Sequence, residues 1–176
     1  MRKVTWSAAV SLDLYLAGPD EALDWLCRSD DAAAIGGASW EGVDTLLMGR
    51  KTYNFAARSG GGGDRAGQSK IKTFIFSRTM AEAPAGAELV RDDAAGFARA
   101  LKARDGGDII VMGGGELGSA PIEGGVVDEL GLDVHPIPLG RCVPFFRPMA
   151  QRIELVLLEA RPIANECVFL RYALTR

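Results

Sequence analysis

Cysteine and histidine, the residues from which disulfide frameworks and zinc sites are built, are scarce in this chain. Among 176 residues there are three cysteines, Cys27, Cys142 and Cys167, and one histidine, His135. An odd number of widely spaced cysteines fits neither a disulfide framework nor a zinc-binding motif. We therefore expect no metal and free, buried thiols. His135 precedes a proline at a predicted strand end, where a structural or surface role is favoured over that of a general acid.

The chain also lacks a surplus of positive charge and a long apolar run. Its net charge is −3, and no apolar stretch approaches the roughly 20 residues of a membrane span. The first residues, MRKVTW, have neither the apolar core nor the cleavage site of a signal peptide. These features predict a cytoplasmic protein with no nucleic-acid or membrane partner. They leave room for a local basic pocket that holds a phosphorylated ligand.

What the chain does have is an alternation of short apolar runs and helical patterns, within a length typical of one domain, 1–176. The alternation predicts an α/β fold with a largely parallel sheet covered on both faces. The last two apolar runs have no helix between them, so one edge of the sheet should be antiparallel. Strands are expected at 3–12, 44–48, 71–77, 88–90, 108–112, 127–134, 153–160 and 168–174, helices at 20–29, 53–58, 94–101 and after 115, and an exposed loop at 59–63.

The expected strand at 108–112 ends in three glycines, Gly113, Gly114 and Gly115. Glycine permits positive φ and close approach of the backbone to a ligand, and a helix start offers unpaired N–H groups. The turn therefore suits a dinucleotide pyrophosphate, and a tight turn without a ligand is the alternative. Gly113, Gly115 and Gly118 also match the Rossmann pattern G-x-G-x-x-G, with Asp133 as its acidic residue. The late position of the match and the antiparallel strands after it disfavour a Rossmann domain.

Polar and basic residues follow two other expected strands. Gly49, Arg50, Lys51 and Thr52 come directly after the strand at 44–48, and the pair Ser77-Arg78 closes the strand at 71–77. Two adjacent cations and a hydroxyl suit a terminal phosphate, although a solvated basic pair is common. Because parallel strands point their carboxyl ends to one edge of the sheet, we expect these residues to lie near the glycine turn. A 2′-phosphate there would distinguish NADPH from NADH.

At these segments the sequence resembles the dihydrofolate reductase superfamily. It is most similar to the branch formed by the reductase domain of the bifunctional riboflavin-biosynthesis deaminase/reductase and its stand-alone relatives. The resemblance implies a three-layer α/β/α dihydrofolate reductase-like fold, with a mostly parallel mixed sheet and an antiparallel C-terminal edge. The segments that carry it are SLDLYLAGPDEALDWL (11–26), DTLLMGRKTY (44–53), KTFIFSR (72–78), IIVMGGGELGSAPIEGGVVDELGLDVHPIPLG (109–140) and VPFF (143–146).

The resemblance also implies an NADPH site. Gly49 to Thr52 would take the 2′-phosphate end, and Ser77 and Arg78 would flank the adenine. Gly113, Gly114, Gly115 and Glu116 would cradle the pyrophosphate, while Ala9 and Leu16 would line the nicotinamide.

On the substrate side, the implied reaction is direct hydride transfer to a small heterocycle, as in 5-amino-6-(5-phosphoribosylamino)uracil reductase. Asp13, Asp24 and Asp133 are the candidate catalytic residues, and Asp24 would be the counterpart of the carboxylate that holds the pterin in dihydrofolate reductases. A solvated side chain is the alternative for Asp24.

Two further functions stay open: a pterin reductase, and a nucleotide-binding protein of this fold without turnover. Members of the branch are often dimers, and the apolar terminal strands suit the interface of a homodimer. The chain departs from the branch at Leu14, where glycine is common, at Arg141-Cys142, which replaces a glycine-rich turn, and at Pro121, which interrupts the helix after the triple glycine.

Overall fold

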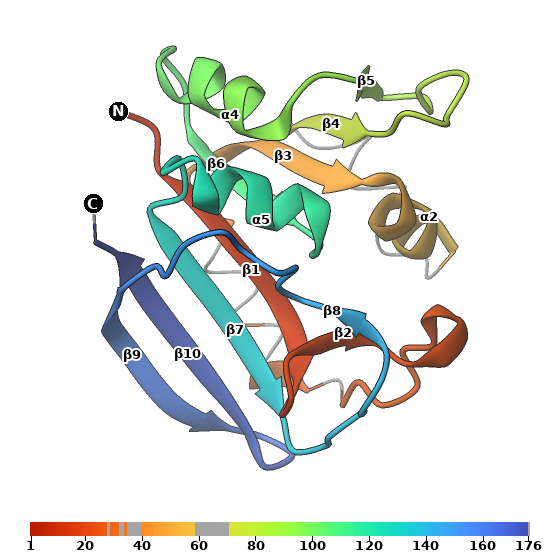
Figure 1. Cartoon of the computed structure of the whole chain (residues 1–176), viewed down its shortest axis with the longest axis vertical. Helices are drawn as coiled ribbons and strands as arrows, with labels where there is room; N and C mark the ends of the chain where they lie inside the picture. The colour runs from red at the N-terminus through yellow and green to blue at the C-terminus, as the bar shows by residue number, and fades with distance from the viewer. Residues whose placement is uncertain (28, 32–33, 35–39, 59–70, 176) are drawn as a thin grey trace.

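An eight-stranded mixed sheet forms the body of the protein in a computed structural model that describes residues 1–176 except 28, 32–33, 35–39, 59–70 and 176 (Figure 1). The strand order is β5-β4-β3-β6-β1-β7-β10-β9. The strands of this sheet are β1 (Val4–Ser11), β3 (Val43–Gly49), β4 (Lys72–Phe76), β5 (Ala87–Val90), β6 (Asp108–Met112), β7 (Glu129–His135), β9 (Leu155–Ile163) and β10 (Cys167–Leu174). The remaining elements are the paired strands β2 (Tyr15–Ala17) and β8 (Val143–Pro144), the 3-10 turn η1 (Pro19–Glu21), and the helices α2 (Arg50–Arg58), α4 (Ala94–Lys102) and α5 (Glu116–Glu123).

The sheet is parallel from β5 to β7 and antiparallel at its C-terminal edge. β1 lies between β6 and β7 and pairs with both in parallel. β10 runs antiparallel to β7, and β9 runs antiparallel to β10. This arrangement confirms the mixed sheet predicted from the pattern of apolar runs. Strand β9 is exposed along most of its length, including Leu155 to Leu158, and the homodimer through the terminal strands stays a prediction.

Alternating side chains divide the core between the two faces of the sheet. On β4, Phe74 belongs to one apolar cluster and Ile75 to the other, and Val111 and Ile110 divide in the same way on β6. Helices α4 and α5 pack on the first face, while Tyr53 of α2 packs on the second. The result is the predicted three-layer arrangement. Each fully buried aliphatic or aromatic side chain contributes about 1.5–3 kcal/mol to folding.

Helix α4 confirms the clearest helical pattern of the sequence. Asp93 caps it, because its carboxylate accepts hydrogen bonds from the N–H groups of Ala95 and Gly96. A cap of this type contributes about 1 kcal/mol. In the part of the chain that the structure describes, no helix has the length and apolar character that crossing a membrane requires.

The helix predicted to begin at Asp20 is wrong. Among the described residues of 20–29, only the short turn η1 forms. Asp20 and Glu21 have left-handed φ angles of 58° and 62°, and Ala22 is extended. The apolar spacing arises because Trp25 is buried against His135, with an edge-to-face ring contact at 5.2 Å. The predicted strand at 127–134 begins instead at Glu129, since Val127 is buried in the loop before it. The loop predicted at 59–63 lies outside the described residues.

The turn after β1 has a backbone conformation that favours glycine, although the chain has leucine at position 14. Leu14 has a φ angle of 61°, a left-handed conformation that a side chain disfavours. Its N–H donates to the carbonyl of Ser11, and its own carbonyl accepts from the N–H of Phe145, both at 2.9 Å. The turn therefore ties β1 to the segment around β8 despite the strained leucine.

Candidate functional site

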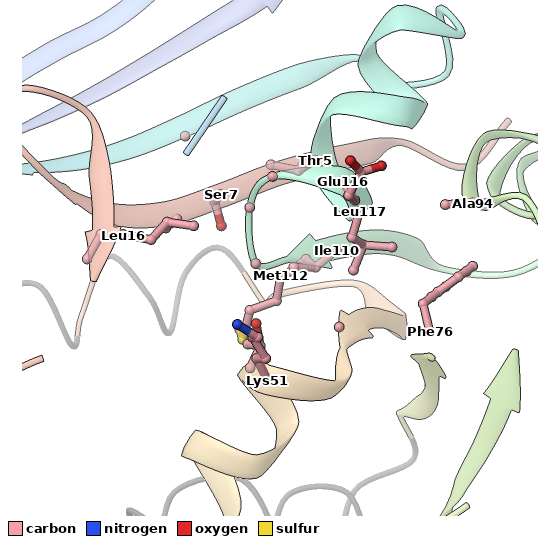
Figure 2. Close-up of a pocket in the computed structure, with 18 of the residues that line it drawn as sticks. Thr5, Ser7, Leu16, Lys51, Phe76, Ala94, Ile110, Met112, Glu116 and Leu117 are labelled. Atoms are coloured by element: carbon pink, nitrogen blue, oxygen red, sulfur yellow. The ribbon is translucent and has the colours of Figure 1, made fainter. Parts of the chain in front are cut away.

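One large cavity opens along the carboxyl ends of β3, β4 and β6. Its volume is about 1460 Å³. Figure 2 shows side chains from β2, α2, β6 and α5 arranged around it, among them Leu16, Lys51 and Met112. Every residue that the sequence predicts to bind the cofactor lines this cavity: Ala9, Leu16, Gly49, Arg50, Lys51, Thr52, Ser77, Arg78, Gly113, Gly114, Gly115 and Glu116.

The glycine turn between β6 and α5 needs glycine for two physical reasons. Gly113 and Gly115 have φ angles of 119° and 56°, which disfavour any side chain. A Cβ atom on Gly113 would lie 2.7 Å from the Thr52 hydroxyl oxygen, and one on Gly114 would overlap the Leu16 side chain. The turn therefore packs against the start of α2 on one side and against β2 on the other.

The N-terminus of α5 is available to an anion. Gly115 occupies the N-cap position and supplies no side-chain hydrogen bond to the first N–H groups of the helix. A Cβ atom built on Gly115 meets nothing within 4 Å, so the backbone there faces open space. Unpaired N–H groups and the helix dipole favour negative charge at such a place. The first turn also carries Glu116, whose carboxylate an anionic ligand would have to avoid.

Trp6 holds the glycine turn in place from inside the core. Its indole N–H donates to the carbonyl of Gly113 at 2.6 Å, and its ring stacks on Phe145 at a centroid distance of 4.1 Å. The N–H of Gly115 donates to the carbonyl of the same Phe145 at 2.9 Å. Gly118 is glycine because a Cβ there would overlap the indole, so its match to a Rossmann pattern reflects packing. Sequence reasoning missed Trp6, whose only signal was an aromatic residue in a buried strand.

The two cations at the start of α2 differ in their surroundings. The Lys51 ammonium lies 2.5 Å from a carboxylate oxygen of Glu21, and this contact holds the pKa of Glu21 below its usual range. Within the described residues, Arg50 forms no ion pair at all. The Arg50 guanidinium is therefore the more available partner for a phosphate.

The loop that carries Arg78 is braced by a second arginine that sequence reasoning also missed. Arg91 donates to the carbonyls of Arg78 at 3.3 Å and of Met80 at 2.7 Å. The Ser77 hydroxyl oxygen accepts from the N–H of Met80 at 3.0 Å, which closes the turn after β4. These bonds fix the place of Ser77 and Arg78 at the rim of the cavity.

Of the three candidate catalytic carboxylates, only Asp133 lines the cavity. Asp13 accepts from the Ser11 hydroxyl at 2.6 Å and from the N–H groups of Leu139 and Gly140 at 3.0 and 2.8 Å. These hydrogen bonds lower the pKa of Asp13 to about 2, and they connect the turn after β1 to the loop after β7. Asp24 is exposed and also stands outside the cavity lining.

Asp133 lies on β7 directly beside Ala9 of β1, the residue that the family resemblance would put at the nicotinamide. Burial raises the pKa of the Asp133 carboxyl above its ordinary range. Its neighbour His135 is 2% exposed, and the Cys167 thiol lies behind the imidazole. Ligand atoms of these three residues lie within 4.8 Å of one another. The thiol lies nearest Nδ1 of the imidazole and the carboxylate nearest Nε2.

The protein has the dihydrofolate reductase-like fold. Its strand order, the parallel pairing of β1 with both β6 and β7, and the cavity at the ends of the strands are typical of that fold. The dihydrofolate reductase of Enterococcus faecalis superposes with a TM-score of 0.69 over 99% of this chain and 97% of that one, at 11% identity. The sequence also matches the RibD C-terminal domain over residues 2–169. The chain therefore belongs to the RibD C-terminal domain family, a family of reductase-like proteins.

Two further relatives match almost end to end. The Bacillus subtilis (strain 168) protein YyaP, named as uncharacterized, is 28% identical over 97% of this chain and 94% of its own length. A solved structure from Shewanella sp. PV-4, named as a candidate riboflavin biosynthesis protein, has a TM-score of 0.82 at 24% identity and covers 99% of each chain. At this identity the solved structures establish the fold and leave the substrate open.

Proposed function

We propose that this protein is an NADPH-dependent reductase that transfers a hydride to a small heterocyclic substrate of the pyrimidine class. The observation that carries the proposal is the single cavity in which the glycine turn, the Arg50-Lys51 pair and the Ala9-Leu16 wall meet. The glycine turn and the basic pair were each predicted from their own segments, whereas Ala9 and Leu16 were expected there from the family resemblance. A solvated basic pair or a turn without a ligand would not need to share one cavity.

The residues that line the cavity fit NADPH, a dinucleotide that carries a 2′-phosphate in addition to its pyrophosphate. The uncapped start of α5 and the open space over Gly115 suit a pyrophosphate. Arg50, with no ion-pair partner among the described residues, and Arg78 on its braced loop suit a 2′-phosphate and the adenine side. When bound, NADPH would supply a hydride. The solved Enterococcus faecalis relative of this fold is described as complexed with NADP(H).

The chain's own contribution to the reaction is orientation. Leu16 reaches across to Gly114, so the wall of β2 closes against the turn that would hold the pyrophosphate. Ala9 leaves space on β1 because its side chain is small, and Asp133 stands next to it. A substrate held here would have its reacting carbon near the nicotinamide, and holding reacting atoms about 3–3.5 Å apart supplies a large part of enzymatic acceleration.

The position of the carboxylates favours a pyrimidine over a pterin. The pterin reading needs the Asp24 carboxylate at the substrate, but Asp24 is exposed and does not line the cavity. The carboxyl that does line the cavity is that of Asp133 on β7, the strand that pairs with β1 on the side away from β6. A polar group in this place suits the ring or the ribosylamino nitrogen of a pyrimidine ribotide.

Two measurements test the proposal. Titration with NADPH, followed by its fluorescence or by calorimetry, should show saturable binding; absence of binding at about 1 mM, which corresponds to roughly −4 kcal/mol, would contradict the cofactor assignment. NADPH oxidation should then be compared with 5-amino-6-(5-phosphoribosylamino)uracil and with dihydrofolate as substrates. We expect turnover with the pyrimidine. Turnover with dihydrofolate alone would favour the pterin reductase, and binding without turnover would favour a nucleotide-binding protein.

A further inference from the structure

A row of buried polar side chains leads from β10 to the cavity. The Cys167 sulfur lies 3.4 Å from Nδ1 of His135, and Nε2 of the same ring lies 3.7 Å from Oδ2 of Asp133. His135 and Cys167 are each 2% exposed, whereas the Asp133 side chain retains 21% exposure at the cavity wall. The imidazole therefore stands between a buried thiol and a carboxyl group that opens on the proposed substrate site.

The hydrogen bonds around His135 indicate which ring nitrogen carries the proton. The backbone N–H of Cys27 points at Nδ1 from 3.4 Å, and a backbone N–H can only donate. Nδ1 is consequently the acceptor, and in the neutral ring the proton resides on Nε2. The Nε2–H group then faces Asp133. Trp25 packs edge-on against the ring at 5.2 Å, which holds this orientation.

The other oxygen of Asp133 has no partner. Oδ1 is buried, and no group in the described part of the chain forms a hydrogen bond with it. A buried oxygen without a partner is costly, by about 1–3 kcal/mol, unless a ligand or a proton satisfies it. The exposed part of the Asp133 side chain lies at the cavity next to Ala9, where a substrate can reach the carboxyl group.

The surroundings of Asp133 favour its neutral form. Burial raises the pKa of its carboxyl, and His135 opposes this rise, because a positive charge on the imidazole would favour the carboxylate. The neighbouring groups on the packed elements are Cys167 on β10, Cys27 on the loop before β3, and Arg161 on β9. Arg161 lies over the ring of Phe169, the cross-strand neighbour of Asp133, and pairs with Glu159 at 3.1 Å. A raised pKa makes a carboxyl group better suited than an ordinary aspartate to act as a general acid.

We propose that Asp133 donates the proton that completes reduction of the substrate, and that His135 is the positioning residue that orients Asp133 through its Nε2–H group. The inference rests on the proposed function. When the acceptor carbon gains a hydride, the electron pair of its double bond moves to the attached nitrogen or oxygen. That atom takes the proton as the O–H bond of Asp133 breaks. Asp133 becomes a carboxylate facing the Nε2–H group, and water at the open side of the cavity returns the proton.

The first test compares Asp133→Asn with Asp105→Asn, an exposed carboxylate outside the cavity. Loss of a general acid lowers kcat by about 100-fold or more, so Asp133→Asn should lose this much with little change in the NADPH Kd. In the wild type, kcat/KM should fall as pH rises through the pKa of Asp133, because the acid form is consumed, and the variant should lack this limb. A kcat of Asp133→Asn within about threefold of wild type would overturn the inference while leaving the reductase intact.

The second test concerns the positioning role. His135→Gln keeps an N–H group near Asp133, whereas His135→Phe keeps only the ring volume. If His135 acts through Asp133, His135→Phe should shift the fall of kcat/KM to higher pH and lower the maximum kcat/KM reached at low pH. His135→Gln should bring the position of the fall and the maximum back towards the wild-type values. If the two variants lower kcat/KM equally and the fall with pH stays where it is in the wild type, His135 has a structural role alone.

The third test needs no turnover. His135 is the only histidine, so its imidazole ¹⁵N signals need no assignment. They should show the Nε2–H form in the wild type and in Asp105→Asn, and Asp133→Asn should change the Nε2 signal. A ring protonated on Nδ1 would overturn the positioning role. If the wild type binds NADPH but turns over neither substrate, both the proposed function and this inference fail together.

Discussion

The two cations at the start of α2 should contribute unequally to the choice of coenzyme. Replacing Arg50 with Ala removes a guanidinium that makes no ion pair within the described residues, so its charge is available to a 2′-phosphate. A hydrogen bond to a charged group is worth about 1.5–3 kcal/mol. The Kd for NADPH should therefore rise by about 10- to 150-fold, since each 1.4 kcal/mol is tenfold.

Lys51→Ala should have the smaller effect. The ammonium of Lys51 is already paired with Glu21 at 2.5 Å, and a phosphate would have to compete with that carboxylate. Exposed pairs of this kind contribute about 0.2–1 kcal/mol. Glu21→Gln should accordingly release Lys51 and tighten NADPH by up to about fivefold.

Fluorescence titration with NADPH and with NADH, at matched ionic strength, measures these effects. NADH has no 2′-phosphate, so its Kd should change by less than about threefold in every variant. The difference between the coenzymes should shrink as salt is added, because salt screens exposed charges. Equal losses for the two coenzymes in Arg50→Ala would show that the phosphate lies elsewhere. A larger loss from Lys51→Ala than from Arg50→Ala would refute the ranking drawn from the Glu21 pair.

Three further predictions concern stability. Gly118→Ala places a Cβ against the Trp6 indole and should lower the free energy of unfolding by about 1–3 kcal/mol or more, measured in urea; an unchanged midpoint would contradict the packing described here. Leu14→Gly should relieve a left-handed strain of about 1–2 kcal/mol, whereas Leu14→Ala should not, and thermal melts of the two variants compare them directly; alanine stabilising as much as glycine would argue against strain at this turn. Asp13 has a pKa lowered to about 2, so its stabilising contribution is present above about pH 4, the range of an unfolded aspartate, and is lost as pH falls through about 2. Acid titrations followed by circular dichroism should therefore show less loss of stability over this range in Asp13→Asn, and an identical acid response would rule the linkage out.

The residues predicted for the cofactor all line one cavity, whereas two of the three predicted catalytic carboxylates do not, and the difference has a physical reason. Parallel strands deliver their carboxyl ends to one edge, so Arg50, Arg78 and Gly113 could be placed together from order and spacing alone. The Asp133–His135–Cys167 row depends on side chains from two strands and on a loop that crosses them. No periodicity encodes such contacts.

Apolar spacing also misled at one segment. Trp25 and its neighbours follow helical intervals, but the left-handed φ angles of Asp20 and Glu21 turn the chain before a helix can begin. The spacing records burial of Trp25 against His135, which is a tertiary contact. In the same way, Gly118 matched a nucleotide-binding pattern and proved to be a packing requirement of Trp6.

The two ends of the proposed cofactor site should differ in how well they tolerate substitution, because Trp6 ties only one of them to the core. At one end the glycine turn packs against the core, because Trp6 donates a hydrogen bond to the Gly113 carbonyl and its ring leaves no room for a side chain at position 118. Substitutions there should therefore lower the stability of the whole fold. At the other end Lys51 and Glu21 form a pair on the surface. Preference between the two coenzymes could therefore be retuned at that rim by a few surface substitutions, while the turn and the fold stay as they are.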